Sequence, residues 1–171
     1  MPTHRHIWML VAAGCMLPAS AAYAQAAACK PVTDAMLKVA TTPHHTASSY
    51  GSRNSETIVA DNASFVRING AWRKSPMTPQ DQLRQEQENI KNAKVYTCTQ
   101  LRTENVNGVA AVAYKVHSET PDVGTTDGTV WIAPSLGLPV KTDEDIATAM
   151  GTKTHLSVTW DYANIHAPVV K

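Results

Sequence analysis

Cysteine, phenylalanine and long apolar runs are all scarce in this sequence of 171 residues. Three cysteines are too few for a small domain that depends mainly on disulfides. The one extended apolar stretch, residues 7–17, is shorter than the roughly 20 residues that a membrane-spanning helix needs. No second stretch of that kind follows it, so the sequence predicts no transmembrane segment after residue 24.

An excess of charge of either sign is also absent. Fifteen basic residues face 14 acidic ones, which gives a formal net charge of +1. Binding to nucleic acid needs a basic face, and electrostatic attachment to anionic lipid needs clustered Lys and Arg. We therefore expect neither nucleic acid nor a charged lipid surface as a partner.

Recognisable catalytic motifs are missing as well. The serines lack the G-x-S-x-G context of a hydrolase nucleophile, and no glycine-rich phosphate loop is present. His44 and His45 are adjacent in a predicted loop, where they do not converge easily on a metal. His117 and His155 fall in predicted strands without the helical i, i+4 partner of a hydrolytic zinc site. We expect a protein that is not an enzyme and has no metal and no cofactor; a metal-dependent hydrolase would require these two strand histidines to converge with carboxylates.

The first 24 residues have the pattern of a secretory signal peptide. Arg5 supplies positive charge, residues 7–17 are apolar, and residues 22–24 form a small-x-small cleavage site. Cleavage there predicts an exported, periplasmic protein with a single domain over residues 25–171. The alternative is a lipid anchor on Cys15, which follows three small residues.

Cys29 and Cys98 remain if Cys15 is removed with the signal peptide. Two cysteines in an oxidising compartment are most simply a disulfide. The bridge would close a loop of about 70 residues and stabilise the fold by ~4 kcal/mol in the chain-entropy description.

Two helices are predicted. Residues 30–40 have helical spacing of apolar residues, with Thr33 or Asp34 as N-cap, and residues 41–49 break the helix. Thr78 and Pro79 begin a second, largely polar helix that ends near residue 92, with a narrow contact stripe. The stripe consists of Leu83, Ile90 and Ala93.

The rest of the chain alternates with the period of two that β-strands have. Asn69-Gly70 and Asn107-Gly108 fit type I′ hairpin turns. The three carboxylates at 143–145 alternate between faces and predict a solvated loop or a charged edge strand. We count seven or eight antiparallel strands. The fold class is α+β: a curved antiparallel half-barrel, mostly a meander, with the N-terminal helix and the inserted helix covering its concave face.

Aromatic side chains are few, but most of them fall in predicted strands. If they share the concave face, they line an apolar ligand cavity; otherwise they form an ordinary core. The candidate ligand-binding residues are Phe65, Trp72, Tyr114, Trp131, Trp160 and Tyr162.

Three segments, NGAWRKSPM, GTVWIAPSLGLPVKTD and TWDYANIHAPV, resemble the exported LolA/LolB-like superfamily of lipoprotein carriers over residues 55–170. The resemblance lies in a V-W-I segment at a strand end, a Gly-Leu-Pro turn, a basic residue opening the next strand, and a tail containing Asn and Pro. The residues that carry it are Val130, Trp131, Ile132, Gly137, Leu138, Pro139, Lys141, Asn164 and Pro168. It implies an unclosed, curved sheet whose concavity binds acyl chains or other apolar ligands.

The expected function is therefore that of a periplasmic, non-enzymatic binding or carrier protein for an apolar or lipid-like ligand. The alternative is an interaction or structural module of the cell envelope without a small-molecule ligand. Its protein partner would meet a sheet edge or the helix at residues 78–92.

Overall fold

The computed structural model describes residues 19–121 and 123–170, with side chains from residue 27 onward. Most of the predicted signal peptide, including Cys15, lies outside the described residues, and both N-terminal alternatives stay predictions. Within the described range the chain forms two helices and nine strands.

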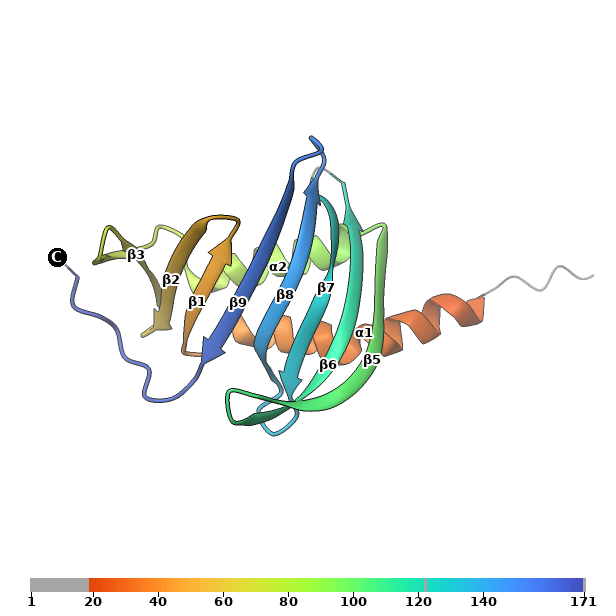
Figure 1. The fold of residues 1–171 in the computed structure, drawn as a ribbon, viewed down its shortest axis with the longest axis horizontal. Coiled ribbons are helices and arrows are strands. Elements are labelled where there is room, and N and C mark those ends of the chain that lie inside the picture. Colours follow the sequence, from red (N-terminus) through yellow and green to blue (C-terminus); the bar gives the residue numbers. More distant parts are fainter. Residues whose placement is uncertain (1–18, 122, 171) are drawn as a thin grey trace, which may run out of the picture.

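The nine strands make one antiparallel sheet in the order β4-β3-β2-β1-β9-β8-β7-β6-β5 (Figure 1). Two meanders, β1–β4 and β5–β9, are joined where β1 pairs with β9. Because β4 and β5 are the two ends of this order, the sheet stays open, and the predicted curved half-barrel is confirmed. The strands are β1 His44–Tyr50, β2 Arg53–Ala60, β3 Ala63–Ile68, β4 Ala71–Lys74, β5 Val95–Val106, β6 Val109–Thr120, β7 Gly124–Ala133, β8 Leu138–Thr148 and β9 Lys153–Asp161.

The first meander contains more strands than predicted. Residues 44–50, expected to be loop, form β1, because β2 and β9 pair with this polar segment on both sides. A second tight turn, at Asp61-Asn62, separates β2 from β3; both residues have positive φ, at 50° and 58°. The predicted hairpins at Asn69-Gly70 and Asn107-Gly108 are confirmed.

Helix α1, Ala19–Val39, is longer than the helix predicted from residue 30. The prediction that Thr33 or Asp34 caps its start was wrong, because both lie inside the helix, where the Thr33 hydroxyl donates to backbone carbonyls of the preceding turn. The helix begins within the predicted leader and continues through the predicted cleavage point after residue 24. Neither helix in the described part of the chain is long and apolar enough to cross a membrane.

Helix α2, Pro79–Asn92, begins as predicted. The Thr78 hydroxyl accepts a hydrogen bond from the Asp81 backbone N–H, and the Asp81 carboxylate accepts one from the Thr78 backbone N–H, which completes a capping box. The helix packs chiefly against α1. Near its start, Gln82 donates to the buried Ser64 of β3 over 2.8 Å.

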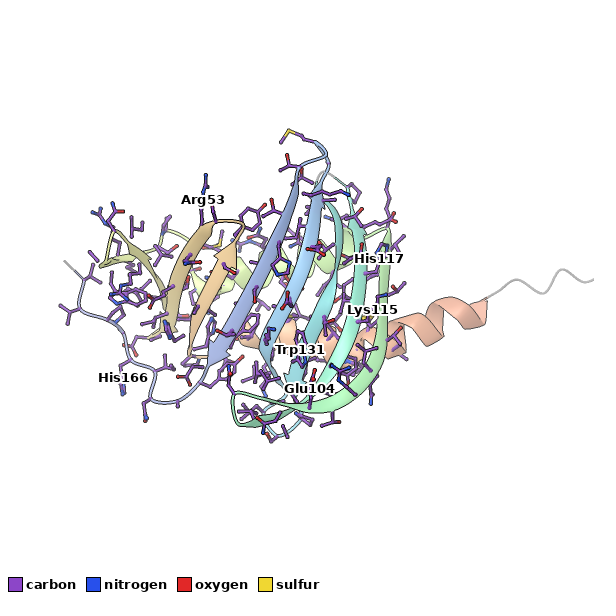
Figure 2. All side chains as sticks on the ribbon, viewed as in Figure 1. Arg53, Glu104, Lys115, His117, Trp131 and His166 are labelled. Atoms are coloured by element: carbon purple, nitrogen blue, oxygen red, sulfur yellow. A yellow bond between two sulfur atoms is a disulfide. The ribbon has the colours of Figure 1, made fainter. Side chains whose placement is uncertain are left out.

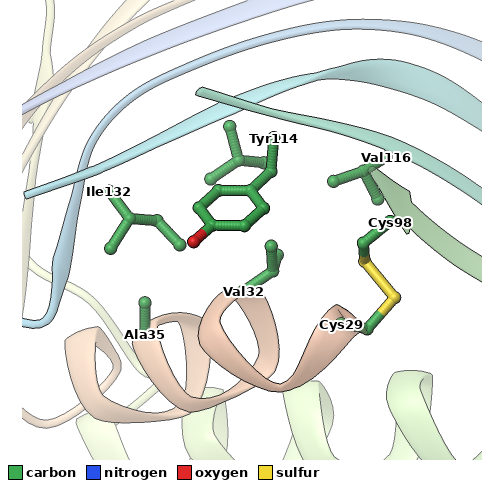
Figure 3. Close-up of a cluster of buried hydrophobic side chains, with 8 residues drawn as sticks. Cys29, Val32, Ala35, Cys98, Tyr114, Val116 and Ile132 are labelled. Carbon is green, nitrogen blue, oxygen red and sulfur yellow. A yellow bond between two sulfur atoms is a disulfide. The ribbon is translucent and has the colours of Figure 1, made fainter. Parts of the chain in front are cut away.

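The main core lies between α1 and the concave face of the sheet (Figure 3). Val32 and Ala35 of α1 pack against Tyr114 of β6 and Ile132 of β7, as Figure 3 shows. The predicted disulfide between Cys29 of α1 and Cys98 of β5 is confirmed, with 4.9 Å between the Cα atoms. It fixes α1 to the edge strand of the half-barrel.

A second apolar cluster lies on the opposite, outer face of the sheet. Ala111, Ala133 and Val140 form its buried centre, and Trp131 and Tyr162 pack against them. The end of the β5–β6 hairpin contributes to this cluster and curls across the lower part of the sheet in Figure 1. The outer face of the half-barrel is therefore partly covered by the chain's own hairpin.

Candidate functional site

A cavity of about 200 Å³ lies between the two helices and the concave face of the sheet, beside the main core. Apolar side chains from both helices and three strands form most of its wall. They include Val32, Met36, Ile90, Tyr96, Val116 and Val130. A concave, largely apolar space with a few convergent polar groups is the usual composition of a small-molecule site.

Glu86 enters this cavity from α2. It lies three residues after Leu83 and four before Ile90, so all three share the face of the helix that Ala93 continues. Leu83, Ile90 and Ala93 are half-buried, in agreement with the predicted contact stripe. The stripe thus presents a carboxyl group at its centre.

Glu144 enters the same cavity from β8. The segment 143–145 was predicted to be a solvated loop or an edge strand; that prediction was wrong, because β8 lies inside the sheet between β7 and β9. The predicted alternation holds: Asp143 and Asp145 contact His155 on the outer face, and Glu144 lies on the concave face.

Gly128 of β7 makes room for Glu144. The two residues are direct cross-strand partners. A Cβ atom at position 128 would lie 2.5 Å from the Glu144 Cγ and 2.5 Å from the Asp143 carbonyl oxygen. The missing side chain therefore allows Glu144 to lie against the sheet at the edge of the cavity.

Both cavity carboxyl groups have a pKa above the ordinary value of 4.5. Burial is the main cause of the raised pKa of Glu86, and the charge of Glu144 adds to it. Burial also raises the pKa of Glu144; the Thr142 hydroxyl opposes this shift and the charge of Asp143 reinforces it. Tyr96 has a raised pKa through burial and through the charges of both glutamates. The three groups therefore interact electrostatically across the same largely apolar space.

The six predicted ligand-binding aromatics are not brought together. Tyr114 packs in the core beside the cavity, among residues that line it. Trp131 and Tyr162 belong to the outer-face cluster, where the Trp131 indole N–H donates to Glu104 and the Tyr162 hydroxyl to the Pro139 carbonyl. Trp131 and Glu104 lie close together in Figure 2.

The other three lie in strands β3, β4 and β9. Phe65 is buried in β3, and Trp72 of β4 meets the His45 ring edge-on at a centroid distance of 6.3 Å. Trp160 of β9 lines a hollow of about 340 Å³ together with Val106 and Val140, which belong to the outer-face cluster. None of the six is among the residues that line the cavity between the helices and the sheet.

The strand histidines lie on the outer face, in the row His117, Asp127, Asp145, His155 across β6 to β9. His117 Nδ1 lies 2.8 Å from Asp127 Oδ1, and His155 Nδ1 lies 2.9 Å from Asp145 Oδ1. Hydrogen bonds to these aspartates raise the pKa of each histidine. Two strands separate the histidines, which places them about 14 Å apart at the usual strand spacing. This arrangement does not provide the convergence that a hydrolytic metal site requires.

A larger hollow, of about 600 Å³, lies over β1, β2 and β3. Serine, asparagine and charged side chains line most of it, including Asn54, Glu56 and Arg67. Its polar wall gives an apolar ligand little surface to bury. The smaller cavity under α2 is the better candidate site because its wall is more apolar than that of the larger hollow and its two acids are desolvated.

The sequence contains signals for part of this site. Glu86 is in register with the apolar stripe of its helix, and Val116 with Ser118 follow the strand alternation. No local signal indicates that Glu144 meets Glu86, because that contact depends on how the inserted helix crosses the sheet.

Comparison with known proteins supports the fold. No protein-family model and no curated protein matches the sequence. Among solved structures, LprF from Mycobacterium bovis matches with a TM-score of 0.50 and 12% sequence identity, over 85% of this chain and 95% of that chain. The Mycobacterium tuberculosis lipoprotein LppX matches with a TM-score of 0.48 and 11% identity, over 84% of this chain and 97% of that chain. The chain therefore shares the fold of LprF. Its membership of the LolA/LolB-like superfamily stays a prediction.

Proposed function

We propose that this chain is a non-enzymatic binding or carrier protein that holds an apolar or lipid-like ligand between α1, α2 and the concave face of the sheet. The observation that carries the proposal is the apolar cavity of about 200 Å³ between these elements. The fold likeness to LprF agrees with it. We also propose that the chain is exported to the periplasm and that its signal peptide is cleaved after residue 24.

The size of the cavity favours one end of a ligand rather than a whole lipid. An apolar cavity of about 150 Å³ holds a molecule the size of benzene, and drug-sized ligands occupy roughly 300–1,000 Å³. A longer acyl chain would require α2 to move away from the sheet. This helix is suited to such movement, because most of its residues are exposed and it packs chiefly against α1.

Native mass spectrometry of the purified protein, followed by organic extraction, tests the proposal. We expect a bound species that organic solvent releases. The variant Thr126→Phe narrows the cavity from β7 and is expected to lose this species. Thr125→Phe is the matched control, because Thr125 is the adjacent residue of the same type and lines a hollow on the outer face. A ligand that survives in both variants, or is absent from the unmodified protein, contradicts the proposal.

A second candidate function is an envelope interaction module, which the exposed edge of β5 favours. This strand has twelve residues and ends the order of the sheet. Such an edge offers unpaired backbone groups to an added strand from a partner. Crosslinking through β5 or α2 to one envelope protein, without any extractable ligand, would support this function over the first.

A further inference from the structure

The charged side chains among the described residues that line the cavity are all acidic. Two carboxyl groups, Glu86 and Glu144, face the space from opposite walls. The other polar lining side chains are Asn89, Ser118, Thr120, Thr126 and Tyr96, and no Lys, Arg or His belongs to the described lining. A ligand that carries a carboxylate or phosphate into this space would meet two acids and no compensating cation.

The neighbouring bases are already paired outside the cavity. Lys141 lies 2.9 Å from Asp143, and His155 of β9 contacts Asp143 and Asp145, all on the outer face of the sheet. The two acids on the outer face of β8, Asp143 and Asp145, therefore have basic partners. Glu144, on the concave face, contacts neither Lys141 nor His155 in an ion pair. No ion pair to Glu86 or Glu144 occurs among the described side chains.

A buried hydroxyl next to Glu144 is also poorly satisfied. Thr142 lies two residues before Glu144 on the same side of β8 and pairs with Val130, which lines the cavity. The residue is 3% exposed; its Oγ1 lies near enough to Glu144 to lower the pKa of that carboxyl but makes no hydrogen bond of good geometry with any described group. Leaving a buried polar group without a partner costs free energy, and a bound ligand or water that reaches it removes the cost.

We infer that the cavity takes a ligand with a protonated amine, whose ammonium group pairs with Glu86 and Glu144 while its apolar part lies among Val32, Val116 and Val130. This inference rests on the proposed function and names the ligand class of the same site. An ammonium group has three N–H donors, enough to serve two carboxylates and a hydroxyl, and such charge-assisted hydrogen bonds are strong in an apolar space. The pairing also removes the cost of two desolvated acids facing each other.

Three probes of equal length test the inference: hexylammonium chloride, hexanol and sodium hexanoate. Each has six carbons, as benzene has, and fits the volume of the cavity. Dissociation constants at pH 7 are measured by NMR titration of the purified protein, observed at the valine methyl groups. We expect hexylammonium to bind about tenfold more tightly than hexanol, with hexanoate weakest.

Matched variants assign the preference to the two acids. Glu86→Gln and Glu144→Gln keep the size of the side chain and are expected to reduce hexylammonium binding about tenfold, while hexanol binding stays the same or improves. Glu88→Gln, on the exposed side of α2, is expected to change neither. Unchanged hexanol binding shows that each variant keeps its cavity.

The outcomes separate this inference from the proposed function. If hexanol or hexanoate binds as well as hexylammonium, the cavity accepts apolar ligands but the amine preference is overturned. Equal loss of hexylammonium binding in Glu88→Gln also overturns it. If no probe of any charge perturbs the valine methyl groups, both the inference and the proposed function fail.

Discussion

Glu86 of α2 and Glu144 of β8 reach into one largely apolar cavity, although they are 58 positions apart in the sequence. Neither belongs to an ion pair among the described residues, and burial is the chief cause of the raised pKa of each. In a chain of nearly balanced charge, this pair is the feature that distinguishes the cavity from an ordinary core.

Glu144→Gln should stabilise the free protein at pH 7 and have little effect at pH 4. Because the pKa of Glu144 is raised on folding, the folded protein binds its proton more tightly than the unfolded chain does. Stability therefore falls as the pH rises above 4.5, and a glutamine escapes this loss. We expect a gain of roughly 1 kcal/mol at pH 7, the scale of an unsatisfied buried polar group. Urea unfolding at both pH values measures it, with Glu88→Gln as control; an equal gain at pH 4 and pH 7 would contradict the explanation.

Gly128→Ala should destabilise the fold by about 1–3 kcal/mol, the usual cost of overpacking. The new methyl group would overlap the Asp143 carbonyl oxygen and the Glu144 side chain. Combining it with Glu144→Ala should recover only part of the loss, because the backbone oxygen stays in place. Urea unfolding of the single and double variants checks this; full recovery in the double variant would mean that the side chain alone causes the strain.

Removing the disulfide by replacing Cys29 and Cys98 with alanine should cost ~4 kcal/mol of stability, mainly through the greater freedom of the unfolded chain. The measurement is the free energy of unfolding in urea. Treating the unmodified protein with a reductant should reproduce the loss, whereas the double variant should be insensitive to the reductant. A double variant as stable as the disulfide-bonded protein would contradict the claim that the disulfide stabilises the fold by restricting the unfolded chain.

The pKa of His44 should lie below 6.5, and the pKa values of His117 and His155 should lie above it. The buried ring of His44 is desolvated, which lowers its pKa, although its hydrogen bond with the Thr42 carbonyl opposes the shift. His117 and His155 have a raised pKa because of hydrogen bonds to carboxylates. Their raised values contribute stability below pH 6.5 that is lost as the pH rises through the folded pKa, whereas the lowered value of His44 costs stability as the pH falls below 6.5.

An NMR titration of the imidazole C–H signals measures these values. Asp127→Asn should lower the pKa of His117 and leave that of His155 unchanged, because His155 contacts other aspartates. Since both outer histidines are substantially exposed, their effect on stability should be small. A midpoint for His117 below 6.5 in the unmodified protein would contradict the pairing with Asp127.

Local signals in the sequence predicted much of the fold. The Thr78 cap with Pro79, and the Asn-Gly turns at 69–70 and 107–108, depend on backbone chemistry within a few residues, and the structure has all three. The β1 strand was missed for the opposite reason. Its residues are polar and follow a proline, so pairing with β2 on one side and with β9, more than a hundred residues later, on the other makes them a strand.

The aromatic side chains illustrate a second limit. Alternation predicts which residues of one strand share a face, but Tyr162 lies beyond the end of β9 and packs beneath the β5–β6 hairpin. Trp131 faces the same outer cluster, because that hairpin curls back over the sheet. The sequence could not indicate that the outer face also has a core, so it offered no way to separate these aromatics from Tyr114.

The central claim is that an apolar ligand lies between α2 and the concave face of the sheet. Isotope-filtered nuclear Overhauser effects between bound hexanol and the methyl groups of the protein test it most directly. We predict contacts from hexanol to Val116, Val130 and Ile90, and none to Ala133 or Val140 of the outer-face cluster. Contacts confined to the outer cluster, or no contacts at saturating hexanol, would contradict the claim.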